Sequence, residues 1–275
     1  MSIGKWINKE LLFLLAFIIV TAGTAYLIAK YVPKKMEDSG KTIEEISVEW
    51  EKKFKESVKS YIAEDSKIVT DKELIGMLET ISDRLLDKID KNPYDVEILL
   101  VQSDVVNAFA FPGGLIVIYT PLIRTCDSPE QLAAVIAHEM GHVIHRDPLR
   151  RLIQQFGVSV LLSMIGSGES VAYLESIIKN VINMKYSRGQ EDKADDFALA
   201  LLDSCLIDPM HFADFMQKIA VDKKSTNFAR WFMTHPDTQS RIDKAMEKSD
   251  EFNNVEDRFT IDWENVRQQL PSVFD

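Results

Sequence analysis

Two histidines and a glutamate stand near the middle of the chain in the order H-E-x-x-H. They are His138, Glu139 and His142, within the stretch AVIAHEMGHVIHRD. On a helix, residues i and i+4 share a face and lie about 6 Å apart along the axis, so two imidazoles there can hold one zinc ion. Glu139 stands beside them and can take a proton from a water molecule that the zinc ion has made more acidic. The spacing predicts a zinc hydrolase centre with Glu139 as general base. The alternative is a helix that exposes two histidines and a solvated glutamate.

A catalytic zinc site needs a third protein ligand and an open fourth position. The metzincin continuation of the motif fails, because position 145 is His145 instead of glycine and position 148 is Pro148 instead of histidine. His145 is one helical turn too far along for one ion to bridge all three histidines, and a surface or supporting role fits it better. A later acidic stretch offers Glu191 as the ligand, with Asp195 one turn on to accept the N–H of a ligand histidine. Taken alone, that stretch is also an ordinary acidic helix start.

Four motifs occur together in this chain, in the order NAFAFPGG (107–114), HEMGHV (138–143), SRGQEDKAD (187–195) and HPDTQSRI (235–242). Their order and approximate spacing resemble the membrane-associated gluzincin metalloendopeptidases, the family of HtpX-like and CAAX prenyl endopeptidases. The resemblance covers roughly residues 70–245 and is greatest to the compact, single-domain bacterial type. It is far more specific than H-E-x-x-H alone.

The resemblance implies a role for each matching residue. It implies one Zn²⁺ per chain, with His138, His142 and Glu191 as its ligands. Glu139 would be the general base, and Asp195 would orient a ligand histidine. His235 would donate a hydrogen bond to a developing oxyanion or reach the metal in a resting state. The alternative for His235 is a helix-entry residue before Pro236. Arg188 and Arg241 are candidate structural ion-pair partners.

The motif that begins at Asn107 implies a substrate-binding strand. Asn107, Ala108, Phe109 and Ala110 would form an edge strand beside the cleft, whose free backbone groups pair with an extended substrate. Plain sheet packing is the alternative for the aromatic residues. The chain departs from many relatives at His145-Arg146-Asp147, where they carry an arginine–histidine pair, so no role is transferred to that position.

The elements that position these residues follow from hydrophobic periodicity. Strands are expected at 96–102, 106–111 and 115–120, with a turn at Pro112-Gly113-Gly114 and an antiparallel arrangement. Ser128 is the expected N-cap of the motif helix, which should end near Asp147-Pro148. Other helices are expected at about 43–61, 70–90, 150–165, 171–184, 188–204, 208–221 and 237–249. The predicted fold class is α+β and mainly helical, a zincin-like core with a small antiparallel sheet and an active-site helix, plus one N-terminal transmembrane helix.

The N-terminal segment predicts a membrane anchor. Residues 11–29 contain no charge over 19 positions, enough to cross a bilayer as a helix. A cleaved signal sequence is the alternative for residues 1–29. Residues 30–42 are polar and are expected to be a linker, which leaves 43–275 as the peptidase domain. Lysines flank the apolar run almost equally, so the positive-inside rule gives little orientation.

Composition narrows the function classes. The net charge is −11, which argues against a nucleic-acid surface. The two cysteines, Cys126 and Cys205, lie far apart without a C-x-x-C pattern, so a cysteine zinc site is excluded and a single disulfide is left open. The oligomeric state is not predicted. A lid is expected at 222–234, which mixes polar and aromatic residues between helices.

The function expected is a membrane-anchored, zinc-dependent endopeptidase. Its partners would be protein or peptide substrates and the membrane, and its catalytic domain would be periplasmic or extracytoplasmic. The role in envelope protein quality control follows from the resemblance only. The main alternative is a latent or chaperone-like binding module with a structural zinc site. Prenyl-protein processing is less favoured, because one N-terminal span does not build an enclosed membrane chamber.

Overall fold

The computed structural model describes residues 43, 46–164, 171–221, 231, 233–236 and 238–271. The chain divides into two compact units, Met1–Glu45 and Ile46–Asp275, and the second holds the sheet and the helices described. The expected anchor at 11–29 and most of the expected lid at 222–234 lie outside the described residues. Within the described ranges, no helix combines the length and apolar character that crossing a bilayer requires.

The first two helices of this unit begin at side-chain caps. Helix α2 (Val48–Asp65) starts after Ser47, whose hydroxyl accepts a hydrogen bond from the Trp50 N–H at 3.2 Å. This cap explains why the helix begins later than residue 43, where the apolar periodicity starts. Helix α3 (Lys72–Leu86) starts after Asp71, whose carboxylate accepts from two N–H groups of the first turn. Its Leu74, Met77 and Leu78 face the core.

The sheet has three strands in the order β1-β3-β2, and they are β1 (Glu97–Val101), β2 (Ala108–Phe111) and β3 (Leu115–Tyr119). Strands β2 and β3 are antiparallel and joined by the glycine turn, where Gly113 has φ 87° and a Cβ would lie 2.3 Å from the Glu51 carbonyl oxygen. Strands β1 and β3 are parallel. The expected all-antiparallel sheet is therefore wrong, because residues 102–107 carry the chain past the position that β3 later fills. The expected α+β class, mainly helical with a small sheet, is confirmed.

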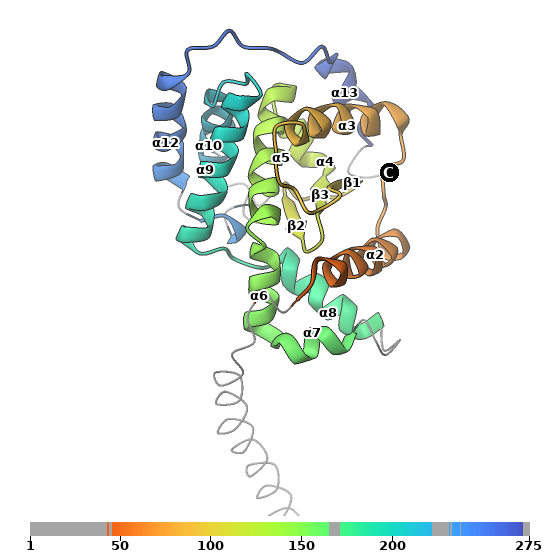
Figure 1. The fold of residues 1–275 in the computed structure, drawn as a ribbon. Helices are drawn as coiled ribbons and strands as arrows, with labels where there is room; N and C mark the ends of the chain where they lie inside the picture. Colours follow the sequence, from red (N-terminus) through yellow and green to blue (C-terminus); the bar gives the residue numbers. More distant parts are fainter. Residues whose placement is uncertain are drawn as a thin grey trace, which may run out of the picture. The chain divides into compact units, whose positions relative to one another are not determined.

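Helix α5 (Pro129–Ile144) is the central element of the fold. Ser128 is its N-cap, as expected, and the described residues from Pro129 to Val143 are all buried. Figure 1 shows α5 between the sheet on one side and α9 (Arg188–Ser204), α10 (Met210–Val221) and α12 (Thr238–Glu251) on the other, and the packing contacts agree. Helix α5 ends before Asp147-Pro148, because Arg146 adopts a left-handed conformation with φ 56°. That residue turns the chain into the next helix.

The remaining helices surround this arrangement. The helix expected at 150–165 is divided at Gly157 into α6 (Asp147–Phe156) and α7 (Val158–Met164), and α8 (Val171–Ile182) follows. The sequence did not predict α4 (Thr120–Thr125) or α13 (Trp263–Gln269). Each is short, and α13 is held by contacts distant in sequence, such as the hydrogen bond from Trp263 Nε1 to the Cys126 carbonyl at 3.0 Å. Cys126 and Cys205 are both buried free thiols.

Candidate metal centre

The two motif histidines project from one face of α5 toward a common point. Their Nε2 atoms lie 3.1 Å apart, and both side chains are fully buried. Two imidazole nitrogens at this distance can share at most one proton between them. A cation held between them would satisfy both lone pairs. The i, i+4 spacing thus places the histidines as the sequence predicts.

A carboxylate reaches the same point from the first turn of α9. The start of α9 is fixed by a capping box, in which Ser187 Oγ accepts from the Gln190 N–H and Gln190 Oε1 accepts from the Ser187 N–H. Glu191 follows directly. Its Oε1 is 3.5 Å from His142 Nε2, and its Oε2 is 3.6 Å from His138 Nε2.

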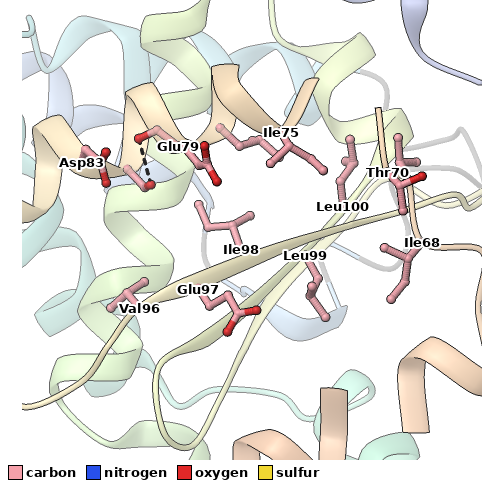
Figure 2. A pocket seen from close by; sticks show the side chains of 13 residues that line it. Ile68, Thr70, Ile75, Glu79, Asp83, Val96, Glu97, Ile98, Leu99 and Leu100 are labelled. Carbon is pink, nitrogen blue, oxygen red and sulfur yellow. Dashed lines mark hydrogen bonds between the residues drawn. The ribbon is translucent and has the colours of Figure 1, made fainter. Parts of the chain in front are cut away.

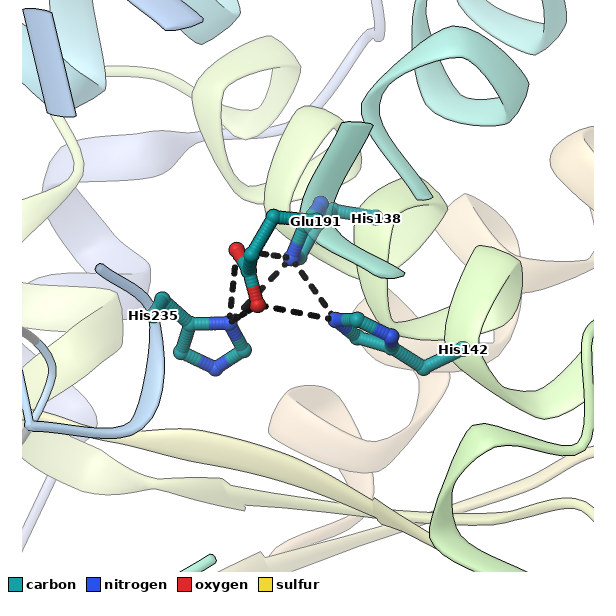
Figure 3. A group of neighbouring side chains, drawn as sticks. All are labelled: His138, His142, Glu191 and His235. Atoms are coloured by element: carbon teal, nitrogen blue, oxygen red, sulfur yellow. Dashed lines mark hydrogen bonds and ion pairs between the residues drawn. The ribbon is translucent and has the colours of Figure 1, made fainter. Parts of the chain in front are cut away.

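His235 supplies a fourth donor atom. Its Nδ1 lies 3.1 Å from Glu191 Oε1 and 3.3 Å from His138 Nε2. The Trp231 ring stacks on the His235 ring with centroids 4.6 Å apart, and the backbone N–H of His235 donates to the backbone carbonyl of Trp231 at 2.8 Å. Figure 3 shows the four side chains converging. One ligand atom from each lies within 4.8 Å of the others.

The donor set fits zinc. Histidine nitrogen and carboxylate oxygen are ordinary zinc ligands, and a tetrahedron with ligand distances near 2.0–2.1 Å separates its donors by about 3.3 Å. The five separations given above span 3.1 to 3.6 Å and use both oxygens of Glu191. With one ligand atom from each residue, the four donors lie within 4.8 Å of one another. With all four protein donors the site is closed, and with His235 withdrawn the fourth position is open. Three ligands and an open position are the arrangement of catalytic zinc sites.

The Glu139 carboxylate faces the Nε2 atom of the His235 ring. Both carboxylate oxygens of Glu139 and the Nε2 of His235 are buried and have no hydrogen-bond partner among the described residues. Glu139 Oε1 and His235 Nε2 are 3.5 Å apart. Buried polar atoms normally have hydrogen-bond partners, so we expect a water molecule or a substrate to supply the partners of these atoms.

An ion-pair network formed by Asp195 and Arg241 holds the ligand side chains in place. Asp195 Oδ1 accepts from His138 Nδ1 at 2.9 Å, and Arg241 grips Asp195 with two nitrogens at 2.7 and 2.8 Å. Arg241 also lies 2.7 Å from Glu191 Oε2. Burial alone would raise the pKa of Asp195, but Arg241 and His138 outweigh it and hold the pKa at about 2. Burial and the nearby Arg241 lower the pKa of His138. Asp195 is therefore charged and His138 is neutral, and the neutral imidazole is the form that binds zinc.

Asp147 is a site residue that the sequence analysis missed. Its Oδ2 accepts from His142 Nδ1 at 2.9 Å, and its Oδ1 accepts from Gln190 Nε2 at 3.0 Å. Burial lowers the pKa of His142, but the hydrogen bonds with Asp147 and Glu191 outweigh it and raise the pKa to about 9. The sequence showed Asp147 only as a helix-ending residue, because the left-handed Arg146 that turns it back toward His142 has no sequence signature.

Three further residues lie outside the four-residue cluster. The Tyr186 ring stacks on the His142 ring with centroids 3.8 Å apart. His145 is outside the four-residue cluster, and its half-buried ring meets Phe197 edge-on at 5.9 Å. Arg188 is exposed at the first position of α9.

The strand predicted to bind substrate lies at one edge of the sheet. The Tyr119 N–H donates to the Asn107 carbonyl at 3.0 Å, so alternate residues from Asn107 pair with β3, and Ala108 and Ala110 direct their backbone groups away from it. Among the described residues nothing bonds to those outward groups or to the buried Asn107 side-chain amide. Phe109 packs edge-on against Phe111 and Tyr119, so the aromatics also fill the core.

The chain matches a known protein family. The profile of Peptidase family M48 matches residues 73–249. This range contains α5, α9 and every residue of the cluster. It also agrees with the range over which the four motifs resemble the gluzincin metalloendopeptidases.

Among curated proteins, the chain is similar to several proteases. It is 28% identical over 197 residues to the beta-barrel assembly-enhancing protease of Yersinia pestis, covering 67% of this chain and 40% of that protein. It is 27% identical over 145 residues to the mitochondrial metalloendopeptidase OMA1 of Arabidopsis thaliana, covering 53% and 30%. It is 27% identical over 170 residues to the metalloprotease LoiP of Escherichia coli (strain K12), covering 60% and 66%. The matched region thus spans less than half the length of the first two relatives.

Proposed function

This chain belongs to peptidase family M48, and we propose on that premise that it is a zinc-dependent endopeptidase with a zincin-like core. The observation that carries the proposal is the convergence of four donor atoms within 4.8 Å beside a glutamate whose two buried oxygens are unpaired. His138, His142 and Glu191 are the proposed zinc ligands, one ion per chain. Their donor atoms are close enough together to bind a single ion.

The chain's own residues supply the proton transfers. When bound, zinc supplies Lewis acidity, which polarises a carbonyl group and makes a water molecule more acidic. Glu139 takes the proton of the attacking water on a free carboxylate oxygen and returns it to the leaving amine. Asp195 and Arg241 hold His138 in the tautomer whose Nε2 is free to bind a metal.

His235 is the proposed second catalytic residue, and it has two positions to occupy. In the arrangement described, its Nδ1 is one of the four clustered donors, so the site is closed. Withdrawn from that place, its ring can donate a hydrogen bond to the oxyanion that develops on the substrate carbonyl. Arg188, at the exposed start of α9, remains a candidate ion-pair residue.

The edge strand β2 is the proposed substrate platform. The outward backbone groups of Ala108 and Ala110 can pair with an extended peptide, and the unpaired amide of Asn107 can bond to the same peptide. Phe109 stiffens the strand through its contacts with Phe111 and Tyr119. Substrates are therefore proteins or peptides in extended conformation.

The decisive experiment measures bound metal and casein hydrolysis together. The full-length chain is compared with Glu139→Gln and with Glu247→Gln, the same substitution at an exposed position on α12. One zinc per chain in all three, with hydrolysis abolished only in Glu139→Gln, supports the endopeptidase. If all three proteins bind zinc and none hydrolyses casein, the result supports a latent enzyme or a binding module with a structural zinc ion. If no protein binds zinc even after zinc is added, both the endopeptidase and this alternative are contradicted.

A second function is favoured by one specific observation, the burial of the centre. His138, Glu139, His142 and His235 are each 0% exposed, and Glu191 is 1% exposed. A site closed in this way is that of a latent enzyme, or of a chaperone-like binding module with a structural zinc ion. Glu139 discriminates between them, because a purely structural site has no use for a general base beside two ligands.

The cellular setting is a further part of the proposal. Residues 1–29 would anchor the chain through 11–29 as a single span, 30–42 would link it, and 43–275 would act in the periplasm or another extracytoplasmic space. The names of the relatives, a beta-barrel assembly-enhancing protease among them, support a role in envelope protein quality control. Reporter fusions at residue 36 and at the C-terminus test the orientation, and activity of a cytoplasm-only reporter at both ends would overturn it.

A further inference from the structure

A groove of about 480 Å³ lies between α3 and the outer edge of the sheet, away from the metal centre. Helix α3 forms one wall, the strand residues Val96 to Leu100 form the other, and residues 68–70 close one end. In Figure 2, Val96, Ile98 and Leu100 project toward α3, whereas Glu97 and Leu99 project to the other face. Because residues from both faces of β1 line the groove, the strand's edge itself borders it.

The edge of β1 offers free backbone groups at the centre of this groove. The Glu97 N–H donates to the Gly114 carbonyl at 2.9 Å, so Glu97 and Leu99 direct their backbone groups to β3. Ile98 and Leu100 direct theirs outward, and the Leu100 carbonyl accepts from the Val69 N–H at 2.9 Å. Within the described ranges, nothing pairs with the Ile98 N–H and C=O. Residues 67–69 thus pair with only the last part of the edge.

The groove combines aliphatic walls with uncompensated negative charge. Ile75, Val96 and Ile98 are half-buried around the free edge. Glu79 and Asp83 are exposed on α3 at i, i+4 spacing, and neither side chain has a hydrogen bond or ion pair in the described part of the chain. Glu97, by contrast, is paired with Lys59 at 2.7 Å. The rim therefore attracts lysine or arginine next to aliphatic side chains.

These features fit an extended peptide better than a folded partner. Unpaired strand edges bind peptides by strand addition, in which backbone bonds give affinity and alternate side chains give preference. A few residues of added strand bury far less than the roughly 1,200 Å² at the lower end of stable protein interfaces. The contact is thus a weak and reversible one, suited to a chain that passes through.

We propose that this groove is an exosite, in which a segment of an unfolded substrate polypeptide adds to the edge of β1. Its aliphatic side chains enter between α3 and β1, and its basic side chains face Glu79 and Asp83. The groove is distinct from the β2 platform, because β1 and β2 are the opposite edges of the sheet. Calling the peptide a substrate rests on the proposed peptidase function, whereas the binding itself does not.

Peptide binding tests the groove without relying on hydrolysis. The full-length chain carrying Glu139→Gln is titrated into labelled unstructured peptides. Their alternate positions, which face one side of an added strand, carry aliphatic residues together with either lysine or glutamate, and serine stands between them. Glu79→Lys with Asp83→Lys is expected to weaken binding of the lysine peptide about five- to thirty-fold and to improve binding of the glutamate peptide. Glu247→Lys with Asp250→Lys, on α12, is the control with the same charge change. Equal effects of the two pairs would overturn the proposal.

The strand edge is tested separately by Ile98→Pro. Proline removes the outward N–H, and edge strands tolerate it where that group faces away from the ladder. About fivefold weaker peptide binding is expected, with the melting temperature as the check on folding. If the variant unfolds, the charge-reversal pair still decides the question.

Hydrolysis then separates the exosite from the peptidase itself. The charge reversal should raise KM for casein severalfold and leave kcat unchanged, and it should not affect a short peptide that cannot span both sites. If the wild type hydrolyses nothing, the peptidase proposal fails while the binding result still decides the groove. If hydrolysis occurs and peptide binding ignores the charge reversal, only the groove proposal fails.

Discussion

Asp147 and His142 form a buried hydrogen bond of 2.9 Å that ties the metal centre to the start of another helix. The second oxygen of Asp147 accepts from Gln190, which completes the capping box with Ser187 and immediately precedes Glu191. The Asp147 carboxylate therefore orients His142 on α5. It also fixes the start of α9, the helix that carries Glu191. This pairing makes Asp147 a positioning residue rather than a ligand.

Replacing Asp147 should weaken zinc binding. In Asp147→Ala, His142 loses the partner that fixes its tautomer, and such losses typically cost 10- to 100-fold in metal affinity. Competition against a chromophoric chelator measures the effect. Asp214→Asn, at an exposed position on α10, is the control and should change nothing. Unchanged zinc affinity in Asp147→Ala would show that the hydrogen bond does not position the ligand.

Zinc affinity should rise with pH. The pKa of His142 is raised from 6.5 to about 9 because, against burial, Asp147 and Glu191 stabilise its protonated form. Zinc binds only the neutral imidazole, so at pH 7 this proton must leave first. Affinity should therefore rise about tenfold per pH unit from about 7 to about 9 and then level off. Asp147→Ala should flatten this dependence, and a flat profile in the wild type would contradict the assignment.

Gly141, inside the H-E-x-x-H motif, should not tolerate a side chain. A Cβ there would lie 3.0 Å from both the Cα and the carbonyl oxygen of Ala194, so α9 would have to move away from α5 and take Glu191 with it. Gly141→Ala is expected to cost about 1–3 kcal/mol of stability and to reduce zinc affinity. Urea unfolding and chelator competition measure these two effects.

Gly76 provides the matched control for that substitution. A Cβ at Gly76, within α3, would meet nothing within 4 Å. Gly76→Ala should therefore stabilise the protein by about 0.5–1 kcal/mol, because alanine is the better helix former. Similar effects of the two substitutions would mean that the close approach of α5 and α9 does not constrain position 141.

The part of the site that the sequence could predict is the part fixed by helical spacing. His138 and His142 share a face of any helix that carries them, and the cap at Ser187 fixes where Glu191 begins its turn. Asp147 could not be predicted in this way, because its direction depends on the left-handed Arg146. That residue is held from outside by Glu51, at 2.7 Å from its guanidinium, and by the Ile46 carbonyl.

The sheet shows the same limit at the level of topology. The turn at Gly113 predicts that β2 and β3 pair, because neighbouring strands joined by a tight turn form a hairpin. The parallel pairing of β1 with β3 depends on which side of β3 the chain enters after residue 101. Local sequence carries no information on that choice, and the observed arrangement packs α3 against β1 and α5 against β2 and β3.

Arg241 should be the costliest of the supporting residues to remove. It is 2% exposed and neutralises both Asp195 and Glu191, so Arg241→Ala leaves two buried carboxylates without their cation. Breaking a buried ion pair in this way costs about 3–5 kcal/mol. Lys244→Ala, which removes a partly exposed pair with Asp196 on the same two helices, should cost less than about 1 kcal/mol. Urea unfolding of the metal-free protein measures both, and zinc should recover part of the Arg241→Ala loss because the ion replaces some of the missing positive charge beside Glu191. Equal losses in the two variants would mean that the carboxylates are satisfied without Arg241.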